Sequence, residues 1–293
     1  MSGPTTRQMS VGAVDLAWAD LGAGPPVLML HGFPDIAMTF LPLAGFLGDR
    51  GYRCVIPWSR GYWPSTAADY YDIGSLIADA LAVMRELDLE RPFVVGHDWG
   101  ADVAYGLAAA RPSEITAVIA MATPHESALG PNRLASFDQL RRSFYEWLFQ
   151  IPEFSDRLLA ANDFAFLRRL WQEWSPEWTP PSEHLDAVIE SIRRGGTSGP
   201  LKYYRAMFDT RLHDPATAEL RADARRPIES PTLFIGGDQD GCIDASMAIG
   251  AEHAFNGPYE REVLTACGHF PHLEQPETVA NLTVDWFTRH ASP

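Results

Sequence analysis

The sequence predicts an α/β protein in which a mostly parallel β-sheet is covered by helices on both faces. Three observations support this prediction. Short apolar runs alternate with longer stretches at helical spacing, these runs are apolar at nearly every position, and one long segment without a strand-like run interrupts the alternation. Near-continuous apolar strands are typical of parallel sheets buried on both faces. The interruption is typical of a large insertion in one loop of such a sheet.

The predicted strands fall into two groups, five before the interruption and two after it. Each is a short apolar run bounded by turn residues or by a helical segment. They are Val14–Ala19, Pro26–Leu30, Arg53–Pro57, Pro92–Gly96, Ile115–Ala122, Pro231–Gly236 and Arg261–Thr265. Both ends of the chain are therefore expected to contribute to one sheet.

Helical spacing marks several segments between and after these strands. Apolar residues recur every three or four positions from Ile73 to Leu87, and Asp72 stands before them as the expected N-cap. Small residues fill a predicted helix over Gly100–Ala110, and a last helix is predicted over Pro276–His290. Helices thus connect consecutive strands, as parallel pairing requires.

The interruption sets the expected domain organisation. A single hydrophobic core stops growing at roughly 250–300 residues, so a chain of 293 residues is expected to be one large domain or a core with an added part. Residues 124–215 contain only helical and aromatic stretches. We therefore expect a core domain formed by residues 1–123 and 216–293, with residues 124–215 as a helical cap.

Charge and cysteine content limit the partners and the location of the protein. The formal net charge is −15, from 23 Lys and Arg and 38 Asp and Glu, and it disfavours binding to nucleic acids and to anionic membranes. Three cysteines cannot all pair, and neither a secretion signal nor a run long enough to span a bilayer is visible. We expect a cytoplasmic protein that binds neither nucleic acid nor membrane.

The segment Gly96-His97-Asp98-Trp99-Gly100 carries the strongest chemical signal. It joins a predicted strand to a predicted helix, and glycines two residues to either side of Asp98 allow a sharp turn. This is the pattern of a nucleophile elbow, with aspartate where serine is usual. A carboxylate at the start of a helix stays ionised and can attack carbon without a general base. The motif alone leaves open that Asp98 only caps the helix.

Two further regions supply the partners that such chemistry needs. His31-Gly32-Phe33-Pro34 follows a strand at the same sheet edge, so the amides of Phe33 and Trp99 are expected to stabilise one oxyanion. A simple turn would also explain its glycine and proline. Asp240 and His269 each follow a later strand, which gives the chain order nucleophile, acid, histidine. A His–Asp pair can deprotonate the water that hydrolyses an ester.

A metal site is not expected from the spacing of the histidines. His269 and His272 could form a metal-binding pair, but no acidic or cysteine ligand accompanies them at a spacing typical of metal sites. No motif for an organic cofactor is visible either. We therefore expect the protein to work with neither a metal nor an organic cofactor.

These motifs together resemble the α/β-hydrolases of the epoxide hydrolase type, and the resemblance spans nearly the whole chain. It implies an α/β-hydrolase fold: a mostly parallel eight-stranded sheet with helices on both faces and an inserted helical cap. It also implies that Asp98 is the nucleophile, with Asp240 as charge-relay acid and His269 as the base that activates water. The amides of Phe33 and Trp99 would form the oxyanion hole.

Two segments of the expected cap resemble those that carry the family's two lid tyrosines, which hold and protonate the epoxide oxygen. Phe144 to Pro152 resembles the first segment and assigns this role to Tyr145. Gly199 to Met207 resembles the second and assigns it to Tyr204, with Tyr203 as the alternative. Two phenol donors would stabilise the alkoxide that forms as the ring opens. The alternative is that these tyrosines only pack within an aromatic lid.

The resemblance implies hydrolysis of a small apolar epoxide, with water, to a vicinal diol. Other residues near the expected site are predicted to contact the substrate. They are His31, Pro34, Trp99, Trp147 and Tyr203. The oligomeric state stays open, with a homodimer as one option.

Three other functions are weighed against this one. Haloalkane dehalogenases use the same kind of triad and Trp99 could bind halide, but that branch usually has Asn where Phe33 stands, and its alternative acid would fall near Glu126. Fluoroacetate-type dehalogenases place two arginines after the nucleophile, where Trp99 and Asp102 stand here. A ligand receptor that has lost turnover would usually lack one catalytic position, and none is missing.

Overall fold

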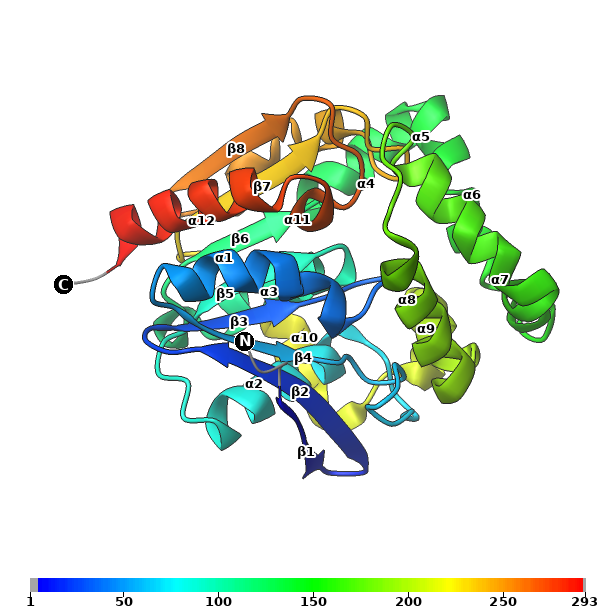
Figure 1. Ribbon diagram of the computed structural model, residues 1–293, viewed down its shortest axis with the longest axis horizontal. Coiled ribbons are helices and arrows are strands. Elements are labelled where there is room, and N and C mark those ends of the chain that lie inside the picture. The colour runs from blue at the N-terminus through cyan, green and yellow to red at the C-terminus, as the bar shows by residue number, and fades with distance from the viewer. Residues whose placement is uncertain (1–4, 292–293) are drawn as a thin grey trace.

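The computed structural model describes residues 5–291 and shows one sheet with helices on both faces (Figure 1). The eight strands lie in the order β1-β2-β4-β3-β5-β6-β7-β8. Their bounds are β1 Thr5–Val11, β2 Val14–Gly22, β3 Pro26–Leu30, β4 Arg53–Pro57, β5 Phe93–His97, β6 Val118–Met121, β7 Thr232–Gly237 and β8 Tyr259–Leu264. The predicted fold class is confirmed.

Strand direction changes at one edge of the sheet. Strand β1 pairs antiparallel with β2, and β2 pairs antiparallel with β4, whereas all other neighbours are parallel. Every residue of the central strands β5 and β6 is buried, as their continuous apolar sequence predicts. The seven other predicted strands are present, but β1 was not predicted, because its residues are mostly polar and exposed, as at many sheet edges.

Helices cover the two faces of the sheet in two groups (Figure 1). Helices α1, α11 and α12 contact one another on one face, and α2, α3 and α10 contact one another on the other. The bounds of the helices before β6 and after β7 are α1 Leu41–Asp49, α2 Ile73–Glu86, α3 Trp99–Ala110, α11 Pro271–Glu274 and α12 Pro276–His290. The predicted cap of α2 is confirmed, because the carboxylate of Asp72 accepts a hydrogen bond from the amide of Gly74 at 3.1 Å.

Only helices occur between β6 and β7, as the missing strand signals predict. Most of them form the group at the right of Figure 1, beyond the end of the sheet. They are α4 Glu126–Ala135, α5 Phe137–Arg142, α6 Phe144–Leu148, α7 Phe154–Trp174, α8 Ser182–Gly195, α9 Ser198–Ala206 and α10 Ala218–Asp223. Helix α7 is kinked over residues 161–164, whose backbone angles are not helical. The bounds of the cap itself, residues 124–215, stay a prediction.

Cysteine state and helix hydropathy complete the description. Cys54, Cys242 and Cys267 are free thiols, and all three are buried. Over residues 5–291, no helix combines the length and the apolar character that crossing a membrane would require.

Candidate active site

Asp98 lies in the sharp turn between β5 and α3 and has a strained backbone. Its φ is 54° and its ψ is −122°, a conformation that is costly for a residue with a side chain and is found mostly at functional sites. The side chain is only 5% exposed and makes no capping hydrogen bond to the helix. Instead, its Oδ1 accepts a hydrogen bond from the amide of Phe33 at 2.6 Å. The interpretation of Asp98 as a simple N-cap is therefore wrong.

Three glycines allow the chain to pack this closely around Asp98. A Cβ on Gly96 would overlap the carbonyl oxygen of Gly100, and a Cβ on Gly100 would overlap the carbonyl oxygen of Leu30. A Cβ on Gly32 would overlap Oδ1 of Asp98 and lie 2.6 Å from the amide nitrogen of Trp99. The amide of Trp99 therefore borders the same carboxylate oxygen as the amide of Phe33, in keeping with their predicted role as an oxyanion hole.

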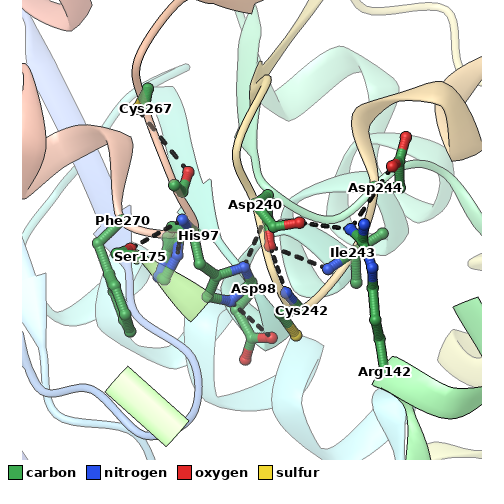
Figure 2. A network of polar contacts seen from close by, with 12 residues as sticks. His97, Asp98, Arg142, Ser175, Asp240, Cys242, Ile243, Asp244, Cys267 and Phe270 are labelled. Atoms are coloured by element: carbon green, nitrogen blue, oxygen red, sulfur yellow. Dashed lines mark hydrogen bonds and ion pairs between the residues drawn. The ribbon is translucent and has the colours of Figure 1, made fainter. Parts of the chain in front are cut away.

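His269 lies between two carboxylates, as the chain order predicts. Its Nδ1 is 2.9 Å from Oδ2 of Asp240, and its Nε2 is 3.7 Å from Oδ2 of Asp98. The other oxygen of Asp240 accepts hydrogen bonds from the amides of Cys242 at 2.7 Å and Ile243 at 2.9 Å (Figure 2). Asp240 is thus held as an anion that orients the imidazole. This hydrogen bond favours Asp240 over Glu126 as the acid of the triad.

The charge state of His269 follows from these two neighbours. Burial disfavours the imidazolium, but the attraction and hydrogen bond of Asp240, with a further contribution from Asp98, outweigh it and raise the pKa of His269 to about 10. His269 is therefore protonated at neutral pH while both carboxylates are charged. It can become a base only after one of these charges is lost.

The two predicted tyrosines face the nucleophile from the helices above the sheet. Tyr145 on α6 and Tyr204 on α9 are each 2% exposed, and their ring centroids are 5.6 Å apart. The hydroxyl of Tyr145 is 3.3 Å from Sγ of Cys242, and within residues 5–291 the hydroxyl of Tyr204 has no hydrogen-bond partner. Burial raises the pKa of both phenols well above its usual value, so both remain proton donors.

Tyr203 points away from Asp98. Its hydroxyl donates a hydrogen bond to the carbonyl of Arg60 at 2.8 Å, and its ring packs against Tyr71 with centroids 5.2 Å apart. Tyr204, in contrast, lines the same cavity as Asp98. The geometry therefore favours Tyr204 as the second donor and does not bring Tyr203 to the substrate position.

A cavity of about 240 Å³ opens in front of Asp98 and is lined by Trp99, Tyr145, Tyr204 and Met207, among others. Sequence analysis missed its polar wall, which contains Asp102, Glu126, Arg133 and Glu146. The carboxylate of Glu146 is 2.7 Å from Nη1 of Arg133, yet burial raises the pKa of Glu146 to about 7. Its position next to Tyr145 in the same short segment was the one available signal.

Three of the residues predicted to contact the substrate lie outside this cavity. His31 is buried, and its Nε2 accepts a hydrogen bond from the amide of Ser59 at 3.0 Å. The carbonyl of Pro34 accepts one from Nε1 of Trp171 at 2.9 Å. Trp147 is 57% exposed and packs on Phe208 with ring centroids 5.3 Å apart. The structure gives these residues supporting or surface positions instead.

The helices between β6 and β7 also brace the catalytic loops. The carbonyl of Trp174, at the end of α7, accepts hydrogen bonds from the amides of His269 at 3.0 Å and Gly241 at 3.1 Å. Arg142 at the end of α5 donates to the carbonyl of Asp240 at 2.6 Å (Figure 2). Both loops that carry the acid and the base are therefore held from the helical side as well as from the sheet.

Two groups of buried side chains have metal-ligand chemistry in the part of the chain that the structure describes. Asp240, Cys242 and His269 form one, but the hydrogen bonds of the triad already occupy its acid and its base. Asp35, His97 and His272 form the other, behind the nucleophile turn. The lining of the cavity itself is accounted for without either group.

Comparison with known proteins agrees with this architecture. The chain is 28% identical to epoxide hydrolase A of Mycobacterium tuberculosis over 324 aligned positions, which cover 98% of both chains. It superposes on epoxide hydrolase A from Mycobacterium thermoresistibile with a TM-score of 0.80, 26% identity and 98% coverage of both chains. An epoxide hydrolase from Vigna radiata, at 24% identity, shares the fold with a TM-score of 0.82 over 99% of both chains.

A family model gives the broader relationship. The model described as the alpha/beta hydrolase fold matches residues 25–276, which span strands β3 to β8 and all the helices between them. The matched region therefore contains the turn of Asp98, the loops of Asp240 and His269, and both tyrosines. The chain belongs to the alpha/beta hydrolase fold family.

Proposed function

We propose that the protein is an epoxide hydrolase that converts a small apolar epoxide to a vicinal diol through an ester on Asp98. One observation carries this proposal: a buried carboxylate, fixed by the amide of Phe33, faces two protonated phenols across one cavity. A carboxylate without a general base attacks carbon, and two phenols opposite it stabilise an oxygen that becomes negative. The names of the similar proteins support the same chemistry.

In the first step, Oδ2 of Asp98 attacks one carbon of the ring while Oδ1 stays on the amide of Phe33. The bond between that carbon and the ring oxygen breaks, and its electron pair moves to the oxygen. Tyr145 and Tyr204 hold this oxygen, and one of them gives it a proton. The products of this step are an alkyl ester of Asp98 and a free hydroxyl group on the neighbouring carbon.

In the second step, water cleaves the ester. Ester formation removes the charge of Asp98, one of the charges that raise the pKa of His269, so the imidazole releases its proton more readily. This proton restores the phenol that gave its own. Neutral His269, oriented by Asp240, then takes a proton from water as the water attacks Cγ of Asp98. The amides of Phe33 and Trp99 stabilise the resulting oxyanion, which collapses to release the diol.

The size of the cavity restricts the substrate. Pockets for drug-sized ligands typically measure about 300–1,000 Å³, and this one measures about 240 Å³. Apolar side chains such as Leu129 and Met207 form part of its wall. We therefore propose a short aliphatic or single-ring epoxide as the substrate. The three free thiols support the further proposal of a cytoplasmic location, where cysteines stay reduced.

A panel of aryl and alkyl epoxides, tested beside haloalkanes of matched size, checks the proposed function. Diol and free halide are measured in parallel for each compound. Diol from the small epoxides is the expected result. Halide without diol would assign the protein to dehalogenation, and tight binding with neither product would assign it to a ligand receptor.

A single turnover in water labelled with oxygen-18 tests the covalent step. Water attacks Cγ of Asp98, so the label should enter the protein at Asp98 and not the diol of that first turnover. Peptide mass spectrometry locates the label. Label in the diol alone would show direct attack of water on the ring and would overturn the ester mechanism.

A further inference from the structure

Three buried side chains from three catalytic loops point at one another behind the nucleophile turn. Asp35 lies after β3, His97 is the last residue of β5, and His272 lies in α11, and all three are fully buried. Oδ2 of Asp35 is 3.5 Å from Nδ1 of His97 and 3.2 Å from Nε2 of His272. The ligand atoms of all three residues lie within 4.8 Å of one another.

None of these facing atoms makes a hydrogen bond within residues 5–291. Buried polar atoms without partners are rare in proteins and call for an explanation. The nearby pair of Asp240 and His269 shows what a completed hydrogen bond between the same residue types looks like, at 2.9 Å. The longer distances at Asp35 match instead the spacing of about 3.3 Å between ligands that surround a tetrahedral zinc ion at about 2.0–2.1 Å.

The hydrogen bond of His97 sharpens this argument. Its Nε2 is 2.8 Å from the carbonyl oxygen of His269, which can only accept, so the proton of the neutral ring is on Nε2. Nδ1 therefore directs a lone pair at the carboxylate of Asp35. Two acceptors that face each other in a buried space require a cation between them, which is either a proton or a metal ion.

The surroundings favour a metal ion over a proton. Burial lowers the pKa of His272 to about 4, so its imidazole is in the neutral form that binds metals. Metal-binding histidines usually donate their second nitrogen to a carbonyl, as His97 does to His269. The second oxygen of Asp35 is likewise held, by the amide of Ile36 at 2.8 Å.

We propose that Asp35, His97 and His272 bind a first-row divalent metal ion, with Zn²⁺ as the probe. Two imidazoles and one carboxylate suit such ions, and a small donor such as water would complete four-fold coordination. The ligands are closed to solvent, so the ion is structural. It ties together the loop of Phe33, the turn of Asp98 and the loop of His269, which carry three parts of the catalytic machinery.

The first test measures metal content. The full chain is expressed in medium supplemented with Zn²⁺, purified and dialysed against a chelator, and zinc is counted by mass spectrometry of the elements. We expect about one zinc per wild-type chain, because a closed structural site exchanges its ion only on unfolding. Zinc absorption spectroscopy should show two nitrogen ligands and one carboxylate oxygen at about 2.0–2.1 Å. Wild-type protein that folds without zinc would overturn the proposal and assign the cluster to a bridging proton.

Variants then locate the ion. His272→Gln should lose the zinc, whereas His125→Gln, which alters a half-buried histidine outside the cluster, should retain it. Cys242→Ser should also retain it, which separates this site from the group around Asp240. Equal zinc in His272→Gln and wild type would contradict the site. If His272→Gln does not fold, unfolding wild type with a chelator and refolding it with and without Zn²⁺ gives the same decision, since only the zinc-loaded protein should recover the higher melting temperature.

Discussion

The loops at the edge of the sheet and the helices above them hold their functional groups in different ways. The carboxylates of Asp98 and Asp240 are fixed by backbone amides at 2.6–2.9 Å. The hydroxyls of Tyr145 and Tyr204 have only a thiol contact and no partner, respectively, and their rings are held by aromatic packing. Charge is thus positioned before substrate arrives, while the proton donors are left free for the substrate oxygen. Changes in the sheet loops should therefore abolish turnover, and changes in the helices should reduce it.

The largest loss is expected from Asp98→Asn. The amide oxygen can still accept from Phe33, but the side chain is no longer an anionic nucleophile, so kcat should fall by about 10⁴-fold or more. Intact-protein mass spectrometry after mixing with epoxide should show no covalent adduct. In His269→Gln the adduct should instead form and accumulate. Steady turnover by either variant would contradict the roles assigned to these two residues.

The next loss separates two carboxylates on one loop. Asp240→Asn should lower kcat by about 10³–10⁴-fold, because the amide no longer orients or stabilises the imidazolium of His269. Asp238, two residues earlier, is exposed and is the matched control. Asp238→Asn should turn over at the wild-type rate. Equal losses in the two variants, measured by steady-state kinetics, would point to disruption of the loop and not to a triad.

A smaller loss is expected in the helices. Tyr145→Phe and Tyr204→Phe should each lower kcat by about 10²-fold, as for removal of one donor from an oxyanion, and the double variant by more. Tyr203→Phe removes only the hydrogen bond to Arg60, so it should cost about 1 kcal/mol of stability and leave kcat unchanged. A larger kinetic loss in Tyr203→Phe than in Tyr204→Phe would reverse the choice between these neighbours.

The smallest effect concerns stability and comes from the cavity wall. Burial raises the pKa of Glu146 from its usual 4.5 to about 7, so between these pH values the folded chain binds a proton that the unfolded chain does not. The free energy of unfolding should therefore fall as pH rises through this window, by on the order of 2 kcal/mol.

Denaturant titrations at pH 4.5 and pH 8 measure this contribution. Glu146→Gln should remove it, so the variant should lose less stability than wild type over the same interval. Glu177→Gln changes an exposed carboxylate after α7 and should follow wild type. A wild-type slope in Glu146→Gln would show that Glu146 is already ionised at low pH.

Much of the fold could be predicted because the pattern of apolar residues reports burial directly. Strands β3 and β4 and helix α12 have the predicted bounds, and Asp72 caps α2 as expected. Strand β1 could not be predicted in this way, because an edge strand needs neither an apolar face nor a covered one. Its pairing with β2 depends on backbone hydrogen bonds, which any sequence can make.

The site could be predicted where one motif holds one group, as at Asp98, and less well where orientation decides. Neighbours on a helix point about 100° apart, so the sequence could not choose between Tyr203 and Tyr204. Residues two apart do not share a face. Tyr145 and Trp147 on α6 therefore cannot both line the cavity, and the expectation for Trp147 could have been rejected on this ground. The cluster of Asp35, His97 and His272 joins three distant loops and has no local spacing to recognise.

The contact between the end of α7 and the loop of His269 has a consequence for traffic through the protein. Trp174 and Ser175 bind the backbone of His269, so this end cannot swing outward without displacing the base. On the opposite side of the cavity, Met207 and Arg225 are exposed and lack comparable ties to the triad. We expect breathing motions to open that side, so that reactant arrives and product departs past Met207 while the proton-accepting apparatus stays anchored.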